Sequence, residues 1–304
     1  MQKRVVFMGT PDYADKILES LIADKNIEVI ALFTQPDKPV GRKKVLTPPP
    51  TKVRAQASNI TVYQPNSLKK ENYELEIVAM EPDFIIVAAF GQILPKSILD
   101  IAPCINLHAS LLPAYRGASP IQQSLLAGDT VTGVTAMLMD VGMDTGDIIT
   151  TKAYEIPSGM LSFELFEALT DVAASLTLEV IHHFDTFTIT PQDDSQASYC
   201  KKISKADGEV DFSSAQDLFY RYQAFTPWPG IYLKSGLKLK RIALAKSSGE
   251  HTPGQILKIE KDCIEVGCSE GSLYLYSVQP VSKKEMDIAS FLNGQRLGLE
   301  DCLA

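Results

Sequence analysis

The chain lacks the sequence signals of membrane-spanning, secreted and metal-binding proteins. No apolar run approaches the roughly 18 residues that a transmembrane helix requires. The opening MQKRVVFMG leads directly into an apolar segment and does not have the pattern of a signal peptide. The 5 cysteines are scattered and include no CxxC pair, which argues against structural disulfides and zinc. We therefore expect a cytoplasmic protein that neither enters a membrane nor holds a metal.

Two common enzyme motifs are missing as well. The first apolar segment ends in a single Gly9 rather than in GxGxxG, which makes a dinucleotide cofactor doubtful. Ser110 lacks the GxSxG context of an activated nucleophile. Neither nicotinamide chemistry nor an acyl-serine mechanism is therefore favoured.

What the chain does contain is the composition of an ordinary globular protein. Its 304 residues, 45% hydrophobic and 22% charged, are enough for two domains. A net charge of −8 argues against nucleic-acid binding by the chain as a whole.

Residues 36–54 (PDKPVGRKKVLTPPPTKVR) depart from this acidic average. They carry six cations and one acid, a local +5, so the remainder of the chain carries −13 (−8 less +5). The cations are Lys38, Arg42, Lys43, Lys44, Lys52 and Arg54. The prolines of this basic segment limit its conformations without supplying a core, so we expect a mobile loop. On charge alone, a solvated surface loop and a polyanion site fit equally well.

Alternating apolar and helical segments define the first part of the chain. RVVFMGT, IEVIALFT, ITVYQ and DFIIVAAF are nearly wholly apolar and are separated by helical stretches, as in a parallel sheet that is covered on both faces. Thr10 is expected to cap the first helix, with Pro11 at its first position. A later segment, SFELFEALTDVAASLTLEVIHHF, has Phe163, Phe166 and Leu169 at helical spacing. These patterns predict a doubly wound, Rossmann-like α/β domain over residues 1–190.

The rest of the chain has a different pattern. The polar, turn-rich stretch TPQDDSQAS, residues 190–198, predicts a linker over residues 191–204. From residue 205 to residue 304, short strand-like runs separated by glycines predict a small antiparallel barrel of the OB type.

Polar side chains follow several of the apolar strands. In CINLHA, Asn106 and His108 are two residues apart, so a strand would place both on one face. MDVGMDTGD adds Asp140, Asp144 and Asp147, and loops at the carboxyl ends of parallel strands converge. An amide, an imidazole and a carboxylate together can move protons and stabilise an oxyanion, as acyl transfer requires. The simpler reading is a turn-capping asparagine and a buried core histidine; a metal site would need more ligands.

These residues belong to a recognisable pattern. NLHASLLPAYRGASP followed by TGVTAMLMDVGMDTGDII closely resembles the signature of the 10-formyltetrahydrofolate-dependent formyltransferases. FMGTPDYAD, TQPDKPVGRKK, LTPPPTKVRA, AFTPWPG and FLNG extend the resemblance, over essentially the whole chain, to the methionyl-tRNA formyltransferases within that family. One departure is Thr226 in AFTPWPG, where the family pattern leads us to expect asparagine.

The resemblance implies roles for residues at the matching positions. Asn106, His108 and Asp144 would form the catalytic centre, and the donor would be 10-formyltetrahydrofolate, without a metal. The implied folate contacts are Phe90, Gly91, Gln92, Ile93, Leu94, Ser110, Leu111, Leu112, Pro113, Asp140, Val141 and Gly142.

The resemblance also implies an acceptor, the α-amino group of methionine on initiator tRNA. An RNA acceptor would use both a basic loop and a second docking domain, whereas a small metabolite needs neither. We expect tRNA contacts at Lys38, Arg42, Lys43 and Lys44 in the loop of residues 36–54, further contacts from the C-terminal domain, and a monomeric protein. The alternatives are an amino-sugar formyltransferase and a non-enzymatic RNA-binding module.

Overall fold

The computed structural model describes residues 2–41 and 43–303, which form two compact units. The N-terminal unit holds the residues up to 120 together with 131–155 and 166–200. The C-terminal unit holds 121–130, 156–165 and the residues from 201 onward. The chain therefore crosses between the units several times before its final passage at residue 200.

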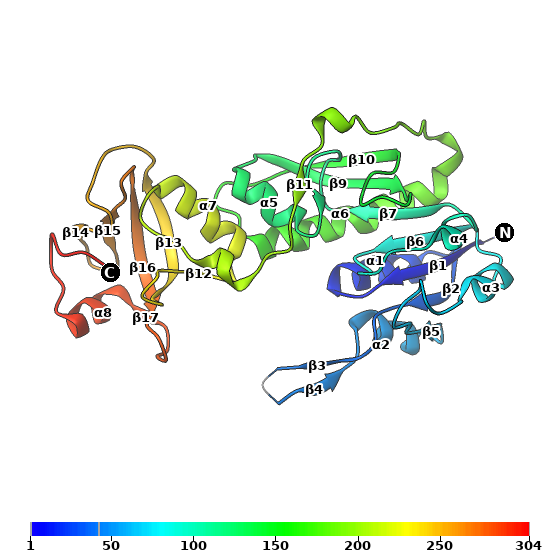
Figure 1. Cartoon of the computed structure of the whole chain (residues 1–304), viewed down its shortest axis with the longest axis horizontal. Coiled ribbons are helices and arrows are strands. Elements are labelled where there is room, and N and C mark those ends of the chain that lie inside the picture. The colour runs from blue at the N-terminus through cyan, green and yellow to red at the C-terminus, as the bar shows by residue number, and fades with distance from the viewer. Residues whose placement is uncertain (1, 42, 304) are drawn as a thin grey trace. The chain divides into compact units, whose positions relative to one another are not determined.

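A seven-stranded sheet forms the centre of the N-terminal unit (Figure 1). Its order is β10 (Ile148–Glu155), β9 (Val131–Leu138), β7 (Cys104–His108), β6 (Phe84–Ala88), β1 (Lys3–Gly9), β2 (Ile27–Phe33) and β5 (Thr61–Tyr63). The strands from β7 to β5 are parallel, as the apolar runs predicted. β9 and β10 form an antiparallel hairpin at the β7 edge. With β1 between β2 and β6, the sheet is doubly wound.

Helices cover this sheet, and their apolar side chains pack against those of the strands. They are α1 (Asp12–Ala23), α2 (Pro50–Ala57), α3 (Glu74–Ala79), α4 (Lys96–Leu99) and most of α6 (Ser162–His183). Val6 and Val87 pack in one cluster with Ile77 of α3 and Ile98 of α4. Burial of each such side chain contributes about 1.5–3 kcal/mol. Cys104 of β7 joins the same cluster, so this face of β7 is anchored in the core.

The first helix begins differently from the prediction. α1 starts at Asp12 with Pro11 as its cap residue, so the expectation that Thr10 caps the helix is wrong. The Thr10 hydroxyl instead donates to the Phe90 carbonyl at 3.3 Å and accepts from the Gln35 amide at 3.3 Å. It therefore connects the loops that follow β1, β2 and β6.

α6 is the long amphipathic helix that the sequence predicted. Leu165, Leu169 and Ala173 are fully buried at helical spacing, whereas the expected core residue Phe163 is 44% exposed. None of the described helices has the length and apolarity to cross a bilayer, and α6 itself carries Glu164 and Asp171.

The basic segment is not an irregular loop. It forms a hairpin of β3 (Lys38–Val40) and β4 (Val45–Thr47), which projects from the N-terminal unit, followed by α2 (Figure 1). In α2, Lys52 pairs with Asp37 at 2.8 Å, and Arg54 pairs with Asp15 at 2.7 Å and with Glu19 at 2.9 Å. Two of the six cations therefore stabilise the unit itself.

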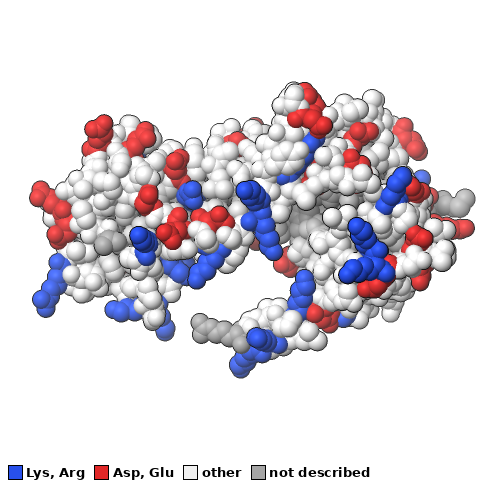
Figure 2. Space-filling view, viewed as in Figure 1, with Lys and Arg blue, Asp and Glu red and all other residues white. Residues whose placement is uncertain are grey.

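The other basic residues of this segment lie on the hairpin. Lys38, Lys43 and Lys44 are exposed, and Figure 2 shows basic side chains gathered at the hairpin. Arg42, the fourth expected tRNA contact, lies outside the described residues. The described charge of the hairpin is therefore carried by three lysines.

The C-terminal unit contains an antiparallel sheet. Its order is β12 (Ile231–Tyr232), β13 (Lys238–Lys246), β16 (Ser272–Gln279), β15 (Ile264–Gly267) and β14 (Ile256–Ile259), with β17 (Met286–Asp287) beside β16. Its helices are α5 (Pro120–Ala127), α7 (Ala215–Phe225) and α8 (Ile288–Gln295). The antiparallel pattern matches the prediction, and the strand pairings within residues 201–303 give an open order rather than a closed ring.

Short elements complete the N-terminal unit. Strands β8 (Arg116–Gly117) and β11 (Tyr199–Cys200) pair in parallel. Three 3-10 helices span Phe184–Thr186, Asp194–Gln196 and, in the C-terminal unit, Lys205–Gly208. Residues 191–200 end in β11, which pairs with β8 of the N-terminal unit. This polar segment is therefore part of the N-terminal unit and not a free connection.

Candidate active site

Asn106, His108 and Asp144 come together at the end of β7. Asn106 and His108 lie on the face of β7 that carries Cys104, because alternate strand residues share a face. The Asn106 amide donates to Asp144 Oδ1 at 3.4 Å, and His108 Nδ1 lies 3.7 Å from the same oxygen. The other oxygen, Asp144 Oδ2, accepts the Gly117 N–H at 2.8 Å. The three side chains thus form one cluster around the Asp144 carboxylate.

Hydrogen bonding fixes the tautomer of His108. Its Nε2 lies 2.9 Å from the Tyr115 carbonyl oxygen, which can only accept, so Nε2 carries a hydrogen. In the neutral ring, Nδ1 is then the unprotonated nitrogen, and it faces Asp144. In the imidazolium, both N–H groups point to acceptors. His108 is 6% exposed, so its proton exchange is confined to the side of the cluster.

The loop that carries Asp144 reaches the cluster by a route that the sequence did not suggest. β9 runs antiparallel to β7, with Leu138 opposite Ile105, so the loop after β9 leaves at the amino end of β7. The expectation that it leaves at the carboxyl ends of parallel strands is therefore wrong. The loop folds back over the sheet face and returns to β10 where the Leu138 amide donates to the Asp147 carbonyl at 2.8 Å.

Backbone geometry makes this return possible. A Cβ at Gly146 would collide with the Leu138 carbonyl oxygen, so only glycine fits there. Asp144 has φ +55, the left-handed region that side chains other than glycine occupy at a cost. Strain of this kind persists where surrounding contacts over-determine the conformation. The loop is thus held in place by its neighbours rather than by its own preference.

Two of those neighbours were missed by the sequence interpretation. Gln192 Nε2 donates to the carbonyl oxygens of Asp144 at 2.9 Å and Gly146 at 2.6 Å. Arg116, 1% exposed, donates to Gln192 Oε1 through Nε at 3.0 Å and Nη2 at 2.8 Å. The sequence pattern places Gln192 in a linker and indicates no role for Arg116. Their polarity was visible in the sequence, but their proximity to Asp144 depends on the pairing of β8 with β11.

The segment of residues 90–94 has two kinds of side chain. Phe90 and Leu94 are 2% and 3% exposed and belong to the core cluster, so only their backbones can reach a ligand. The Gln92 amide binds the Pro65 carbonyl and the Leu68 amide, both at 2.9 Å. The accessible residues of this segment are Gly91, which has φ +77, and Ile93, which is 77% exposed.

Residues 110–113 are similarly divided. The Ser110 hydroxyl is fully buried and donates to the Ala114 carbonyl at 2.6 Å, so it serves the turn. The Leu112 amide donates to the Thr135 hydroxyl at 3.0 Å, and the Leu112 side chain is 6% exposed. Leu111 and Pro113 are half-buried and remain accessible.

In the loop of residues 139–147, Asp140 organises the first turn. Its carboxylate accepts from the Thr145 hydroxyl at 2.8 Å and the Gly142 amide at 2.9 Å. Val141 and Met143 are 73% and 65% exposed. Met139 packs against the core cluster to which Phe90 and Leu94 also belong.

Cysteines near the cluster do not supply a nucleophile. Burial raises the pKa of Cys104 to about 12 and also raises the pKa of Cys200, whose thiol lies 3.4 Å from the Tyr115 carbonyl. A thiol with a raised pKa is a poor source of thiolate at neutral pH. Within residues 2–41 and 43–303, no group of three or more histidine, cysteine or acidic side chains is arranged to hold a metal.

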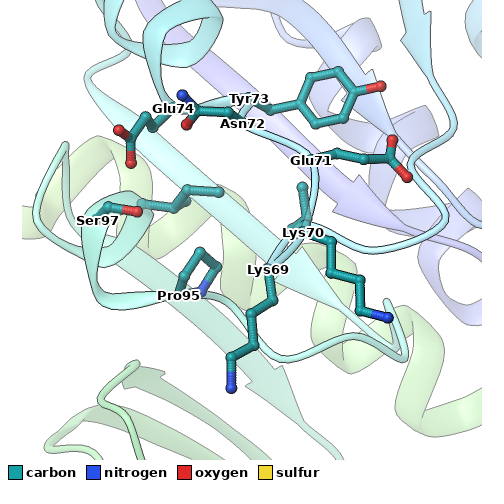
Figure 3. A pocket seen from close by; sticks show the side chains of 10 residues that line it. Lys69, Lys70, Glu71, Asn72, Tyr73, Glu74, Pro95 and Ser97 are labelled. Atoms are coloured by element: carbon teal, nitrogen blue, oxygen red, sulfur yellow. The ribbon is translucent and has the colours of Figure 1, made fainter.

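A polar hollow of about 220 Å³ has a lining that includes none of the cluster residues, and Figure 3 shows the side chains around it. It is lined by residues 68–74 with Pro95, Ser97 and Ile98, and Lys69 and Lys70 lie on its border. None of the expected catalytic or folate-binding residues lines it. It touches the site only indirectly, because Gln92 joins Leu68 to the segment of residues 90–94.

Comparison with known proteins identifies the family of the chain. Residues 3–181 match the formyl transferase family model, and residues 202–296 match the formyl transferase C-terminal domain. The methionyl-tRNA formyltransferase of Sulfurimonas denitrificans is 56% identical, with 99% of this chain and 100% of the relative covered. That of Campylobacter jejuni strain RM1221 is 46% identical, with 99% of each covered.

Solved structures share the fold at much lower identity. An N-formyltransferase from Helicobacter canadensis, in complex with folinic acid and dTDP-3-aminofucose, aligns with a TM-score of 0.69 at 16% identity, covering 91% of this chain and 99% of that one. HypX from Aquifex aeolicus, in complex with tetrahydrofolic acid, aligns with a TM-score of 0.61 at 15% identity, covering 100% of this chain and 49% of that one. The chain belongs to the formyl transferase family, among its methionyl-tRNA formyltransferases.

Proposed function

We propose that this protein transfers the formyl group of 10-formyltetrahydrofolate to the α-amino group of methionine on initiator tRNA. The observation that carries the proposal is identity of 46–56% to methionyl-tRNA formyltransferases over 99% of the chain, together with the cluster around Asp144. The likeness to sugar formyltransferases is one of fold alone, at 16% identity. The product, N-formylmethionyl-tRNA, is used in translation initiation, so we place the enzyme in the cytoplasm.

The residues around the cluster fit a folate donor. Ile93, Val141 and Met143 are strongly exposed apolar side chains on two segments that both pack against the core cluster. We propose that they form one apolar patch, because contiguous exposed patches of this kind mark ligand sites. Gly91 lets a ring system approach the backbone closely, whereas the space beside Gly142 is occupied by the Thr145 hydroxyl. We propose that the pterin lies along residues 140–142 and that Leu111 and Pro113 border the same site.

The bound donor supplies a formyl carbon that an amine can attack. In the Asn106 amide one N–H goes to Asp144 Oδ1, which leaves the second to stabilise negative charge on the formyl oxygen. His108 Nδ1 is the nitrogen free to exchange a proton, because Nε2–H is held by the Tyr115 carbonyl. We assign to it protonation of the departing amine nitrogen.

Asp144 would take part in the second proton transfer, from the attacking amine. The attacking amine must be neutral, and it loses a proton as the new C–N bond forms. Asp144 Oδ1 faces both Asn106 and His108, so it can orient the imidazole, stabilise its charged form and accept the amine proton directly or through water. No covalent enzyme intermediate is needed, consistent with the buried Ser110 and the raised pKa of Cys200.

The tRNA would be bound by exposed charge. Lys38, Lys43 and Lys44 lie on the β3–β4 hairpin, and Arg42 directly precedes Lys43 in the sequence. Exposed lysines neutralise phosphates without reading sequence. We propose that this hairpin and the C-terminal unit together hold the acceptor arm, and that the enzyme acts as a monomer.

One assay tests the proposal. The purified protein is incubated with 10-formyltetrahydrofolate labelled in the formyl group and with methionyl initiator tRNA, a nucleotide-linked amino sugar, or no acceptor. We expect label in the methionyl-tRNA alone. Label in the amino sugar would favour a sugar formyltransferase, and tRNA binding without label transfer would favour a non-enzymatic RNA-binding module.

A further inference from the structure

Arg116 is a buried cation with an unusual set of partners. It is 1% exposed, and it forms an ion pair at 2.8 Å with Asp194, whose side chain is 84% exposed. Its other partners are neutral, Gln192 Oε1 and the Tyr199 hydroxyl at 3.3 Å from Nη1. A buried charge is costly unless hydrogen bonds satisfy it, and here two of the four bonds go to one amide oxygen.

That arrangement fixes the orientation of the Gln192 side chain. An amide can usually flip, exchanging its oxygen and nitrogen. In Gln192 a flip would turn the NH₂ group toward the guanidinium, donor against donor. The Arg116 fork therefore selects the orientation in which Nε2 faces the carbonyl oxygens of Asp144 and Gly146. Both N–H groups of the amide are used on the loop that carries Asp144.

The same short strand holds the Asp144 carboxylate. Gly117 follows Arg116 in β8 and donates its N–H to Asp144 Oδ2 at 2.8 Å. β8 is fixed in turn by the Arg116 amide, which donates to the Ser198 carbonyl at 2.8 Å, and by its pairing with β11. Gly117 of β8 thus holds the Asp144 side chain, and Arg116 of β8 holds the Asp144 backbone through Gln192. Together they keep Asp144 at its unfavourable φ of +55.

We infer that Gln192, locked by Arg116, is a positioning residue that sets the Asp144 carboxylate against Asn106 and His108. The inference rests on the proposed catalytic role of Asp144. Displacement by about 1 Å at a reacting group can cost on the order of 100-fold in rate. Gln192 acts by preventing such displacement of a strained loop, while itself touching neither substrate.

Gln192→Glu is the variant that tests this. It keeps the size of the side chain and its acceptors for Arg116, but it places an oxygen against the carbonyls of Asp144 and Gly146. We expect kcat to fall about 10- to 100-fold, with KM for 10-formyltetrahydrofolate and for methionyl-tRNA changed less than about twofold. Gln192→Met, an apolar side chain of similar length, serves as the second variant if the first does not fold.

Asp194→Asn is the matched control. It removes the exposed charge partner of Arg116 and leaves every hydrogen bond of Gln192 in place, so kcat should stay within about twofold of the wild type. An equal loss of kcat in Asp194→Asn and Gln192→Glu would overturn the inference, since it would indicate general loosening of residues 191–194. Wild-type kcat in the folded Gln192 variants would overturn it as well.

A measurement independent of turnover separates this inference from the proposed function. Amide hydrogen exchange of Gly117, followed by NMR, reports its bond to Asp144 Oδ2. Faster exchange in Gln192→Glu, with unchanged exchange in Asp194→Asn, supports the positioning role even if the wild type formylated no acceptor. Unchanged exchange at Gly117 in both Gln192 variants would contradict it even if the wild type formylates methionyl-tRNA.

Discussion

The cluster around Asp144 and the β3–β4 hairpin are built in opposite ways. In the cluster, His108 is 6% exposed and the Asp144 carboxylate and backbone are bonded to Asn106, Gly117 and Gln192. In the hairpin, every residue of the two three-residue strands is exposed, and so are Lys43 and Lys44. Proton transfer needs fixed geometry, whereas phosphate neutralisation needs only accessible charge. The difference predicts which measurements each region controls.

The largest expected effect is on the chemical step. His108→Ala, Asn106→Ala and Asp144→Ala should each lower kcat by about 100- to 10,000-fold, because general acid–base catalysis contributes about 100- to 10,000-fold and one oxyanion donor about 100- to 1,000-fold. Folate binding, measured by calorimetry, should remain. Since the three residues act as one unit, the double variants should lose little more than the single ones.

Two outcomes would break this side of the comparison. Turnover near that of the wild type in any one variant would remove that residue from the proposed role. Loss of the folded state in His108→Ala would instead make His108 a residue of the core, as its burial alone would allow.

The second effect is on recognition. Replacement of Arg42, Lys43 and Lys44 by alanine should raise KM for methionyl-tRNA about 10-fold or more and leave KM for 10-formyltetrahydrofolate unchanged. Each lost phosphate contact also flattens the dependence of log K on log salt, by up to about 3 contacts here. Initial rates and tRNA binding at several salt concentrations measure both quantities.

A charge-matched control keeps this test specific. Lys69, Lys70 and Lys96 are exposed lysines of the same unit that lie away from the hairpin. Their replacement by alanine removes the same net charge and should leave KM and the salt dependence nearly as they were. Equal effects in the two triple variants would reduce the hairpin to one part of a general electrostatic field.

The sequence predicted the parallel part of the sheet and one part of the cluster. Apolar runs predicted the parallel strands from β7 to β5, because a strand buried on both faces must be apolar throughout. Period-2 alternation placed Asn106 and His108 on one face. Both inferences depend on local pattern, which a single sequence contains.

What the sequence did not predict depends on pairing between distant segments. The direction of β9 relative to β7 decides where the loop of residues 139–147 leaves the sheet, and no local pattern records it. The polar residues 191–200 resemble a linker until β11 pairs with β8 and brings Gln192 to Asp144. Likewise, Lys52 and Arg54 counted as free charge until their acids were placed beside them.

The third prediction concerns those paired cations. Arg54→Ala removes the bonds to Asp15 and Glu19 and should lower the free energy of unfolding by about 1 kcal/mol, the upper range for a partly exposed ion pair. It should leave the salt dependence of tRNA binding unchanged. Thermal unfolding and salt titration of the same variant give the two values, and a flattened salt dependence would return Arg54 to the tRNA-binding surface.

The smallest expected effect is a change in the pKa of Asp37. The Lys52 ammonium, and then the Gln64 amide, hold the pKa of Asp37 below its ordinary value by hydrogen bonding. A lowered folded-state pKa contributes stability that is present above the unfolded pKa of about 3.9 and is lost as the pH falls through the folded value. Near pH 7 this contribution to the free energy of unfolding is fully present. Its loss can therefore be measured only in acid.

Lys52→Met should raise the pKa of Asp37, followed by NMR titration of its carboxyl carbon, and should make acid unfolding less steep below about pH 4. The bond from Gln64 to Asp37 Oδ1 at 2.8 Å remains, so the pKa stays somewhat low. Lys43→Met is the matched control, because Lys43 is exposed in the hairpin turn and Asp37 pairs with Lys52. If both variants shifted the pKa equally, the lysines of α2 and of the hairpin would act on Asp37 alike, and the division between paired and exposed cations would fail.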